Sequence, residues 1–274
     1  MSQGAGSDVG EHVQMLPRRQ FRKCAALASL CLAGTAAAWV ARSPAAPAQS
    51  TVAPVVLPGQ QPRYQYRPIH DPDGTGRFYM GREIARVMGP GGLAWLDRPE
   101  RESEEHPELV IAVMDLRPGE VVADLGAGSG YFTFRIAPKV APAGKVFAVD
   151  IQDAMLATLR QRAAELGVAN VVEVKATETD PRLPAHSLDA VLLVDVYHEL
   201  AYPFEVMSRV REALKPGGQV FFVEYRKEDP TIRIKVLHKM SVDQLVKEMT
   251  AVGLVHVATN ESLPLQHIVI FQKP

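Results

Sequence analysis

Cysteine is nearly absent from this 274-residue chain. The two cysteines, Cys24 and Cys31, lie together in an apolar stretch near the N-terminus. The sequence after Cys31 therefore has no disulfides, no thiolate zinc ligands, no cysteine nucleophile and no iron–sulfur cluster, because each of these needs a thiol.

An excess of one charge is also missing. The chain carries 30 Lys and Arg residues against 31 Asp and Glu residues, a formal net charge of −1. The first 48 residues hold five of the basic and two of the acidic side chains, which leaves a mildly anionic remainder. Because such a body has no global attraction for a phosphate backbone, we expect no nucleic-acid partner.

Long hydrophobic runs are limited to one segment, at 24–41. Basic residues precede it at 18–23, and the small-residue segment at 45–48 follows it. This order predicts an export signal over 1–48, and the paired Arg18 and Arg19 resemble the twin-arginine type, so we expect the periplasm or an equivalent compartment. A membrane anchor and an organellar transit peptide remain alternatives, since about 18 apolar residues can also cross a bilayer. We expect no other membrane contact.

The next part of the chain is predicted to be a linker followed by a helical lid. Residues 49–76 are rich in turn-forming residues and have no sustained period, as is typical of a linker. Apolar residues at helical spacing begin near Arg77, with Phe78, Ile84, Ala85 and Val87. This spacing predicts a helical lid over 77–104.

Short apolar runs then alternate with helical segments. The pattern predicts, in chain order, a helix at 105–116, a strand at 121–125, a helix through 132–137, a strand at 146–149, a helix at 154–166, strands at 171–174 and 190–194, a helix at 204–214, a strand at 219–224, a helix at 241–252, and a final strand pair at 255–258 and 267–271. Continuous apolar strands are typical of a parallel sheet covered on both faces. We therefore expect one doubly wound α/β domain over 77–274.

The first strand of this domain runs into a glycine-rich turn, Asp124-Leu-Gly126-Ala-Gly128-Ser-Gly130-Tyr131. Glycine allows a backbone to turn tightly or to approach a bound nucleoside closely. The next strand ends in Asp150, followed by Ile151, where a carboxylate can accept hydrogen bonds from both ribose hydroxyls. Because ligands of open α/β sheets lie beyond the carboxyl ends of the strands, these features predict a nucleoside site.

Two kinds of nucleoside ligand fit such a turn. A dinucleotide fingerprint needs a third glycine, G-x-G-x-x-G, and here Tyr131 occupies its place. Asp124 would also repel a pyrophosphate, whereas it suits the ammonium of an amino-acid moiety. A nicotinamide-dependent oxidoreductase on the same fold is thus the disfavoured alternative.

With these motifs the sequence resembles the class I S-adenosylmethionine-dependent methyltransferases. Lys215-Pro-Gly-Gly before the fifth strand and the final strand pair also match this family, and the resemblance covers about 105–271. The segments at 80–101, 177–184 and 196–199 further resemble a branch of bacterial-type predicted methyltransferases that often carry export signals. The family implies a mostly parallel seven-stranded sheet, S-adenosylmethionine as cofactor, and cofactor contacts at Asp124, Gly126, Gly128, Gly130, Tyr131, Asp150, Ile151, Thr177, Glu178 and Asp195.

The methyl acceptor should lie beyond the fourth strand, where Asp195, Tyr197 and His198 follow. His198 is our candidate base, because its ordinary pKa near neutrality suits removal of a proton as the methyl group arrives, and Asp195 and Tyr197 are the other candidate catalytic residues. Alternatively, Tyr197 to Glu199 only begin a helix. The remaining histidines show no metal-ligand spacing, so we expect no metal and interpret His238 as structural.

The acceptor is expected to be a small molecule, since no basic surface or added recognition domain is evident. The candidates for its pocket are Glu224, Tyr225, Arg226 and Trp95. We interpret Arg98, Arg101, Glu104 and Glu105 as a solvated helix start, with the alternative that the two arginines clamp an anionic acceptor. An exported enzyme would lie where this cofactor is not expected to be made. A non-catalytic nucleoside-binding protein therefore remains a second alternative.

Overall fold

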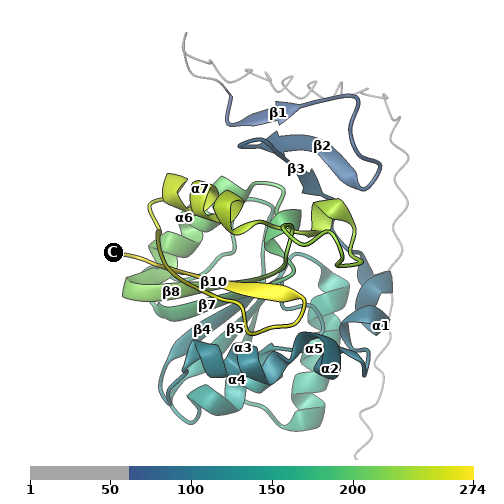
Figure 1. The fold of residues 1–274 in the computed structure, drawn as a ribbon. Helices are drawn as coiled ribbons and strands as arrows, with labels where there is room; N and C mark the ends of the chain where they lie inside the picture. Colours follow the sequence, from purple (N-terminus) through teal and green to yellow (C-terminus); the bar gives the residue numbers. More distant parts are fainter. Residues whose placement is uncertain (1–61) are drawn as a thin grey trace, which may run out of the picture. The chain divides into compact units, whose positions relative to one another are not determined.

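The structure of this protein is a computed structural model that describes residues 62–274 (Figure 1). The predicted export signal at 1–48 and the first part of the predicted linker lie outside the described residues. Within 62–274, no helix combines the length and the hydropathy that crossing a bilayer requires.

A seven-stranded sheet forms the centre of the domain. Its strands are β4 (Val121–Leu125), β5 (Lys145–Asp150), β6 (Val171–Lys175), β7 (Leu188–Val194), β8 (Leu214–Tyr225), β9 (Val255–Asn260) and β10 (Gln266–Gln272). They lie in the order β6-β5-β4-β7-β8-β10-β9. The first five pair in parallel, and β10 runs antiparallel to both β8 and β9. The predicted mostly parallel seven-stranded fold is confirmed.

Helices cover both faces of this sheet (Figure 1). They are α3 (Pro107–Met114), α4 (Thr133–Val140), α5 (Asp153–Leu166), α6 (Pro203–Ala213) and α7 (Val242–Ala251). Successive residues of β8 show the two cores: Val220 and Phe222 pack with α6 and α7, whereas Phe221 and Val223 pack with α3 and α4. Side chains alternate across a strand, so the apolar run of β8 is buried on both sides.

The N-terminal part of the domain differs from its prediction. A three-stranded antiparallel sheet of β1 (Tyr64–Tyr66), β2 (Gly74–Tyr79) and β3 (Arg82–Ala85) replaces both the end of the predicted linker and the predicted helix near Arg77. Met80 and Gly81, at φ of 47° and 104°, form the two-residue connection of β2 to β3. Tight hairpins need such positive φ values, which glycine adopts at little cost. Helices of this region begin only at α1 (Leu93–Leu96) and α2 (Arg101–Glu105).

The small sheet is joined to the main domain by buried charge. Arg82 of β3 forms an ion pair of 2.7 Å with Glu248 of α7, and both side chains are almost fully buried. Arg82 also donates a hydrogen bond of 3.2 Å from Nη1 to the carbonyl oxygen of His198. The sheet and the chain that follows it are thereby held against the carboxyl end of β7.

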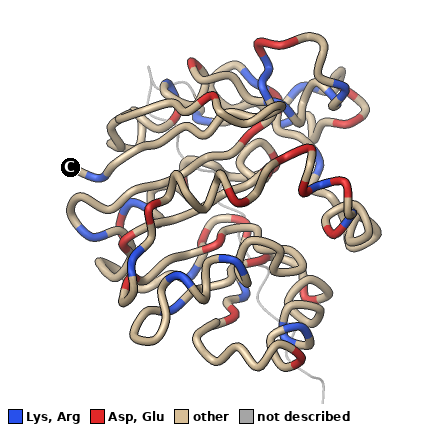
Figure 2. The backbone as a smooth tube through the Cα atoms, turned by 60° about the horizontal axis from the view of Figure 1, so that its bottom comes forward, with Lys and Arg blue, Asp and Glu red and all other residues tan. Residues whose placement is uncertain are grey.

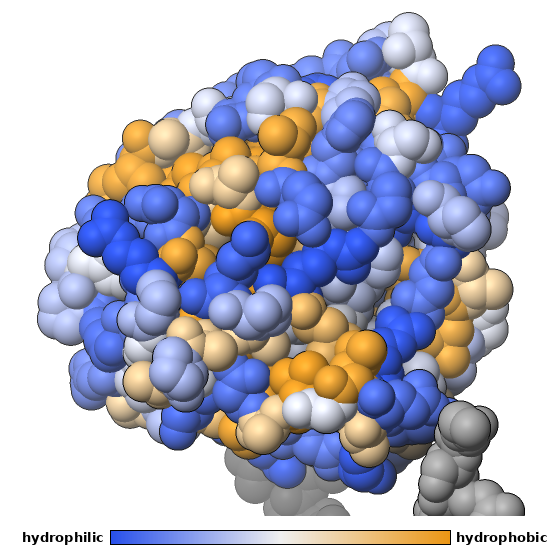
Figure 3. All heavy atoms as spheres, turned by 90° about the horizontal axis from the view of Figure 1, so that it is seen from below, coloured by the Kyte–Doolittle hydropathy of each residue, from blue (hydrophilic) through white to orange (hydrophobic). Residues whose placement is uncertain are grey.

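Acidic and basic residues are mixed along the described backbone in the view of Figure 2. Figure 3 shows hydrophobic side chains gathered in patches that are separated by hydrophilic ones on one face. The two edge strands of the large sheet expose valines, Val172 on β6 and Val255 and Val257 on β9.

Candidate cofactor and acceptor site

A cavity of about 580 Å³ lies at the carboxyl ends of β4, β5 and β7, where the strand order reverses. This is the place where open α/β sheets bind ligands. Eight of the predicted site residues line it: Gly126, Gly128, Asp150, Ile151, Thr177, Glu178, Asp195 and His198. Four others do not: Asp124, Gly130, Tyr131 and Tyr197.

Gly126 forms the floor of the cavity immediately after β4. Its φ is +79°, and a Cβ at this position would lie 2.4 Å from Cγ2 of Val196. Its N–H donates a hydrogen bond of 2.8 Å to the carbonyl oxygen of Val149 on β5. Both the backbone conformation and the contact with Val196 therefore require glycine here.

Asp150 fixes the position of two loops. The carboxylate accepts hydrogen bonds from the N–H of Gly128 (3.0 Å) and from the N–H of Gln152 (2.8 Å). Burial raises the pKa of Asp150, against the lowering effect of these backbone donors. An ionised carboxylate has about four acceptor sites, so two remain for hydroxyl groups of a ligand. The geometry fits the predicted ribose contact.

Asp195 provides an unsatisfied oxygen to the same cavity. Its Oδ2 accepts a hydrogen bond of 2.8 Å from Nε2 of Gln266, whereas its Oδ1 is shielded from water and has no partner among the described residues. Burial, followed by the nearby charges of Glu105 and Glu224, raises the pKa of Asp195 well above its ordinary value. A buried polar atom without a partner is rare in folded proteins, and a donor group on a ligand would satisfy it.

Asp124 is placed differently from the prediction that it meets an ammonium group. It is buried beneath the glycine-rich turn, where its Oδ2 accepts a hydrogen bond of 2.6 Å from Oγ1 of Thr133. The carboxylate therefore secures the first turn of α4. Gly130 likewise packs on α4, since a Cβ there would lie 2.4 Å from the ring of Phe134.

The two tyrosines are structural in this geometry. The hydroxyl of Tyr131 donates to Glu102 on α2 at 2.6 Å, and its ring lies against Arg101 and Arg135. Tyr197 is fully buried, and its hydroxyl donates to Glu248 at 2.5 Å. Tyr197 does not line the cavity, so the structure does not bring it to the predicted catalytic position.

The lid side contributes residues that were interpreted as a solvated helix start. Arg101 and Glu105 are 4% and 2% exposed and form an ion pair of 2.8 Å. The hydroxyl of Tyr225, at the end of β8, donates to Glu105 at 3.1 Å. All three residues line the cavity, as does Trp95. The interpretation of Arg101 as part of a solvated helix start is therefore wrong. Tyr225 and Trp95, two of the candidates for the acceptor pocket, do line the cavity.

Two cavity residues, Met88 and Gln152, had no sequence signal. Met88 and Gln152 meet through a hydrogen bond of 3.0 Å from Nε2 of Gln152 to the carbonyl oxygen of Met88. Glu199 and His238 also line the cavity. These residues come from separate loops, and no motif spacing connects them.

The buried charge of Asp124 makes a testable contribution to stability. Burial raises the pKa of Asp124 to about 6, above its value in an unfolded chain. The native state then holds the extra proton between about pH 4 and pH 6, so this group makes the protein less stable as pH rises through that range. We compare the unfolding free energy of Asp124→Asn with that of the parent at each pH. We expect the difference in favour of the variant to grow by about 2 kcal/mol from pH 4 to pH 8.

Urea unfolding of both proteins at several pH values measures this difference. Asp153→Asn, at an exposed position of α5, serves as the control with no expected pH-dependent gain. An Asp124→Asn curve parallel to that of the parent from pH 4 to pH 8 would contradict the assignment of a raised pKa to Asp124.

The family of the chain is decided by comparison with known proteins. A family model described as a methyltransferase domain matches residues 123–220, which contain the glycine-rich turn, Asp150 and Asp195. Residues 123–220 therefore match a methyltransferase domain, in agreement with the predicted resemblance to the class I S-adenosylmethionine-dependent methyltransferases. The cofactor of this family is S-adenosylmethionine, and the predictions of family and cofactor are confirmed.

Two of the similar curated proteins are named as C-methyltransferases. "Ubiquinone/menaquinone biosynthesis C-methyltransferase UbiE" of Ectopseudomonas mendocina is 32% identical over 129 residues, which are 47% of this chain and 50% of that protein. The protein of the same name from Cupriavidus metallidurans is 30% identical over 119 residues, 43% of this chain and 49% of its own length. The chain thus spans about half the length of the curated relatives that it matches.

Among solved structures, a SAM-dependent methyltransferase from Aquifex aeolicus has the same fold. It superimposes with a TM-score of 0.65 at 23% identity, over 69% of this chain and all of that chain. This likeness supports the fold of the methyltransferase domain.

The residues of the cavity fit the methyltransferase cofactor. Asp150 has acceptor sites left for the ribose hydroxyls, and Gly126 and Gly128 line the same cavity. Oδ1 of Asp195 has no partner among the described residues, and the ammonium of the methionine moiety would satisfy it on contact. Thr177 and Glu178 line the cavity after β6, and their predicted adenine contacts stay predictions.

Proposed function

We propose that this protein transfers the methyl group of S-adenosylmethionine to a carbon atom of a small molecule that carries a phenolic or enolic hydroxyl. The observation that carries the proposal is the cavity at the carboxyl ends of β4, β5 and β7, which Asp150 and Asp195 line together. The printed names of the curated relatives, which are C-methyltransferases, support carbon as the acceptor atom. They lend no support to a dehydrogenase or to a non-catalytic nucleoside-binding protein.

The chain's own groups would position the two reactants. Asp150 orients the ribose, and Asp195 accepts from the methionine ammonium, so that the reactive end faces the loop after β7. The bound cofactor supplies an activated methyl group on a positively charged sulfur. The acceptor carbon would take this methyl group while the carbon–sulfur bond breaks with its electrons left on sulfur, and the proton displaced from that carbon would pass to water. Holding both reactants in line provides much of the rate in such a transfer.

Full-length protein titrated with S-adenosylmethionine and with its demethylated product tests the cofactor. We expect dissociation constants in the micromolar range, about −8 kcal/mol, and no heat from NADH. Incubation with radiolabelled S-adenosylmethionine and a panel of small phenols and enols, with mass analysis of the products, then tests carbon methylation. Failure to bind either cofactor form overturns the enzyme assignment, and label only on oxygen or nitrogen overturns the choice of carbon.

The compartment and the size of the acceptor belong to the same proposal. The sequence at 1–48 supports export, and the near balance of 30 basic and 31 acidic residues is in keeping with a small acceptor rather than a nucleic acid. Mass measurement of the mature N-terminus after expression in a bacterial host tests the export signal. A chain that retains residues 1–48 in the cytoplasmic fraction would contradict it.

A further inference from the structure

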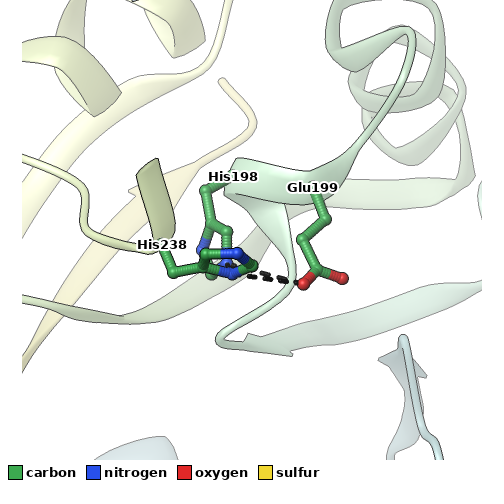
Figure 4. A group of neighbouring side chains, drawn as sticks. All are labelled: His198, Glu199 and His238. Atoms are coloured by element: carbon green, nitrogen blue, oxygen red, sulfur yellow. Dashed lines mark hydrogen bonds and ion pairs between the residues drawn. The ribbon is translucent and has the colours of Figure 1, made fainter. Parts of the chain in front are cut away.

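Three side chains with metal-binding atoms converge at one wall of the cavity. His198 and Glu199 belong to the short helix η2 (Tyr197–Glu199), and His238 ends the short helix η3 (Val236–His238). Figure 4 shows both imidazole rings and the carboxylate directed at one point. Among residues 62–274 these are the three that group in this way.

The distances between these atoms suit one metal ion. Nε2 of His198 lies 3.0 Å from Nδ1 of His238, Oε1 of Glu199 lies 3.3 Å from Nδ1 of His238, and the same oxygen lies 3.9 Å from Nε2 of His198. The circle through these three atoms has a radius of about 2.0 Å. An ion slightly above the centre of this circle therefore lies ~2.1 Å from each atom. That is the length of zinc–nitrogen and zinc–oxygen bonds.

The outer ring nitrogens face carboxylates. Nδ1 of His198 is hydrogen-bonded at 2.6 Å to Oε2 of Glu224, which is completely buried. Nε2 of His238 lies 3.0 Å from Oδ2 of Asp73, without the alignment of a hydrogen bond. Because an ionised carboxylate accepts and does not donate, the ring proton of His198 belongs on Nδ1. The lone pair of Nε2 of His198 is then free to bind a cation beside Nδ1 of His238, 3.0 Å away.

The three ligands are held in place before any ion arrives. The carboxylate of Glu199 accepts hydrogen bonds from the N–H of Met88 at 3.2 and 3.3 Å. The backbone of His198 is fixed by Arg82, which donates to its carbonyl oxygen. All three ligand residues line the cavity, with side chains 2%, 13% and 21% exposed for His198, Glu199 and His238. The remaining coordination positions therefore open towards the acceptor side.

We propose that His198, Glu199 and His238 bind one divalent transition-metal ion, with zinc as the first probe. Two imidazole nitrogens and one carboxylate oxygen suit zinc, iron or nickel, whereas magnesium and calcium prefer oxygen ligands alone. Three protein ligands and an open position are the arrangement of catalytic rather than structural zinc sites. A metal ion at this place is contrary to our expectation that the chain binds no metal. It also takes the place of His198 as a base, because Nε2 of His198 becomes a metal ligand. The open coordination position of the metal receives the hydroxyl oxygen of the acceptor, a step that rests on the proposed function.

Metal binding is tested on the full chain without cofactor. Protein stripped with a chelator is titrated with ZnCl₂ by calorimetry at pH 7.5, and the bound metal is counted by elemental analysis after dialysis. We expect Glu199→Gln and His238→Ala to bind one zinc ion fewer than the parent, or to bind it at least 30-fold more weakly. His256→Ala, on the exposed strand β9, is the matched control and should bind as the parent does. The comparison between variants is needed because Cys24 and Cys31 can bind zinc on their own.

Cobalt(II) gives a second readout at the same site. Its visible absorption spectrum should change when the stripped parent protein is titrated, and Glu199→Gln should lose that change while keeping the circular dichroism of the parent. Equal zinc and cobalt binding by the parent, Glu199→Gln and His238→Ala overturns the metal site. Zinc binding in a protein that fails to bind S-adenosylmethionine would overturn the proposed function alone, and the reverse result would overturn the metal site alone.

Discussion

Asp150→Ala is expected to weaken S-adenosylmethionine binding by about 10²- to 10⁴-fold. Two hydrogen bonds from ribose hydroxyls to a buried carboxylate are worth about 1.5–3 kcal/mol each. The 7% exposure of Asp150 excludes most of the water that would otherwise take over these bonds. Calorimetric titration of the parent and the variant with S-adenosylmethionine measures the loss.

Two further variants separate ligand binding from loop structure. Asp150 also accepts from the N–H groups of Gly128 and Gln152, so its removal can disturb both loops. Asp150→Asn keeps one acceptor oxygen and the size of the side chain, and we expect its affinity to lie between those of the parent and Asp150→Ala. Asp153→Ala, three residues on and exposed, should bind as the parent does. Unchanged affinity in Asp150→Asn would show that the ribose contact lies elsewhere.

The main sheet could be predicted because its strands carry a strong local signal. Each of β4, β5, β7 and β8 is an apolar run that neighbouring strands and helices bury, and the glycine-rich turn marks where β4 ends. The Ser241 cap of α7 was equally local: its side chain accepts from the N–H of Gln244, three residues later. In these cases the physical cause of the structure lies within a few residues of the pattern.

The N-terminal sheet was missed because two periodicities overlap there. Phe78, Ile84 and Ala85 fit helical spacing, yet Met80-Gly81 forms a hairpin connection that reverses the chain between them. In this segment the decisive feature was the turn, not the apolar period. The burial of Arg82, opposite a carboxylate 166 positions away in the chain, gives no local signal at all.

The cluster of His198, Glu199 and His238 could not be predicted for a related reason. The two histidines are 40 positions apart, and each lies on a helix of three residues whose position depends on tertiary contacts. Metal-ligand spacing is readable in a sequence only where ligands share one helix or one loop. The same limit applies to Glu224, which meets His198 from the end of β8.

The buried pair of Arg82 and Glu248 should have a large effect on stability. Glu248 also accepts from the hydroxyl of Tyr197 at 2.5 Å and from Nε2 of Gln244 at 2.7 Å. Glu248→Leu would leave the guanidinium of Arg82 buried without a counter-charge, and we expect a loss of about 3–5 kcal/mol of unfolding free energy. Denaturant unfolding followed by circular dichroism measures it.

A double variant decides whether charge or packing causes this loss. Removal of both charges in Arg82→Met/Glu248→Leu eliminates the unpaired guanidinium, so the double variant should be more stable than Glu248→Leu alone. Glu212→Leu, from the exposed pair of Glu212 with Arg209, should cost less than about 1 kcal/mol. If the double variant unfolds at the denaturant concentration of Glu248→Leu or below it, the loss arises from packing around α7. If it recovers, the ion pair is what holds the small sheet and the backbone of His198 beside the cavity.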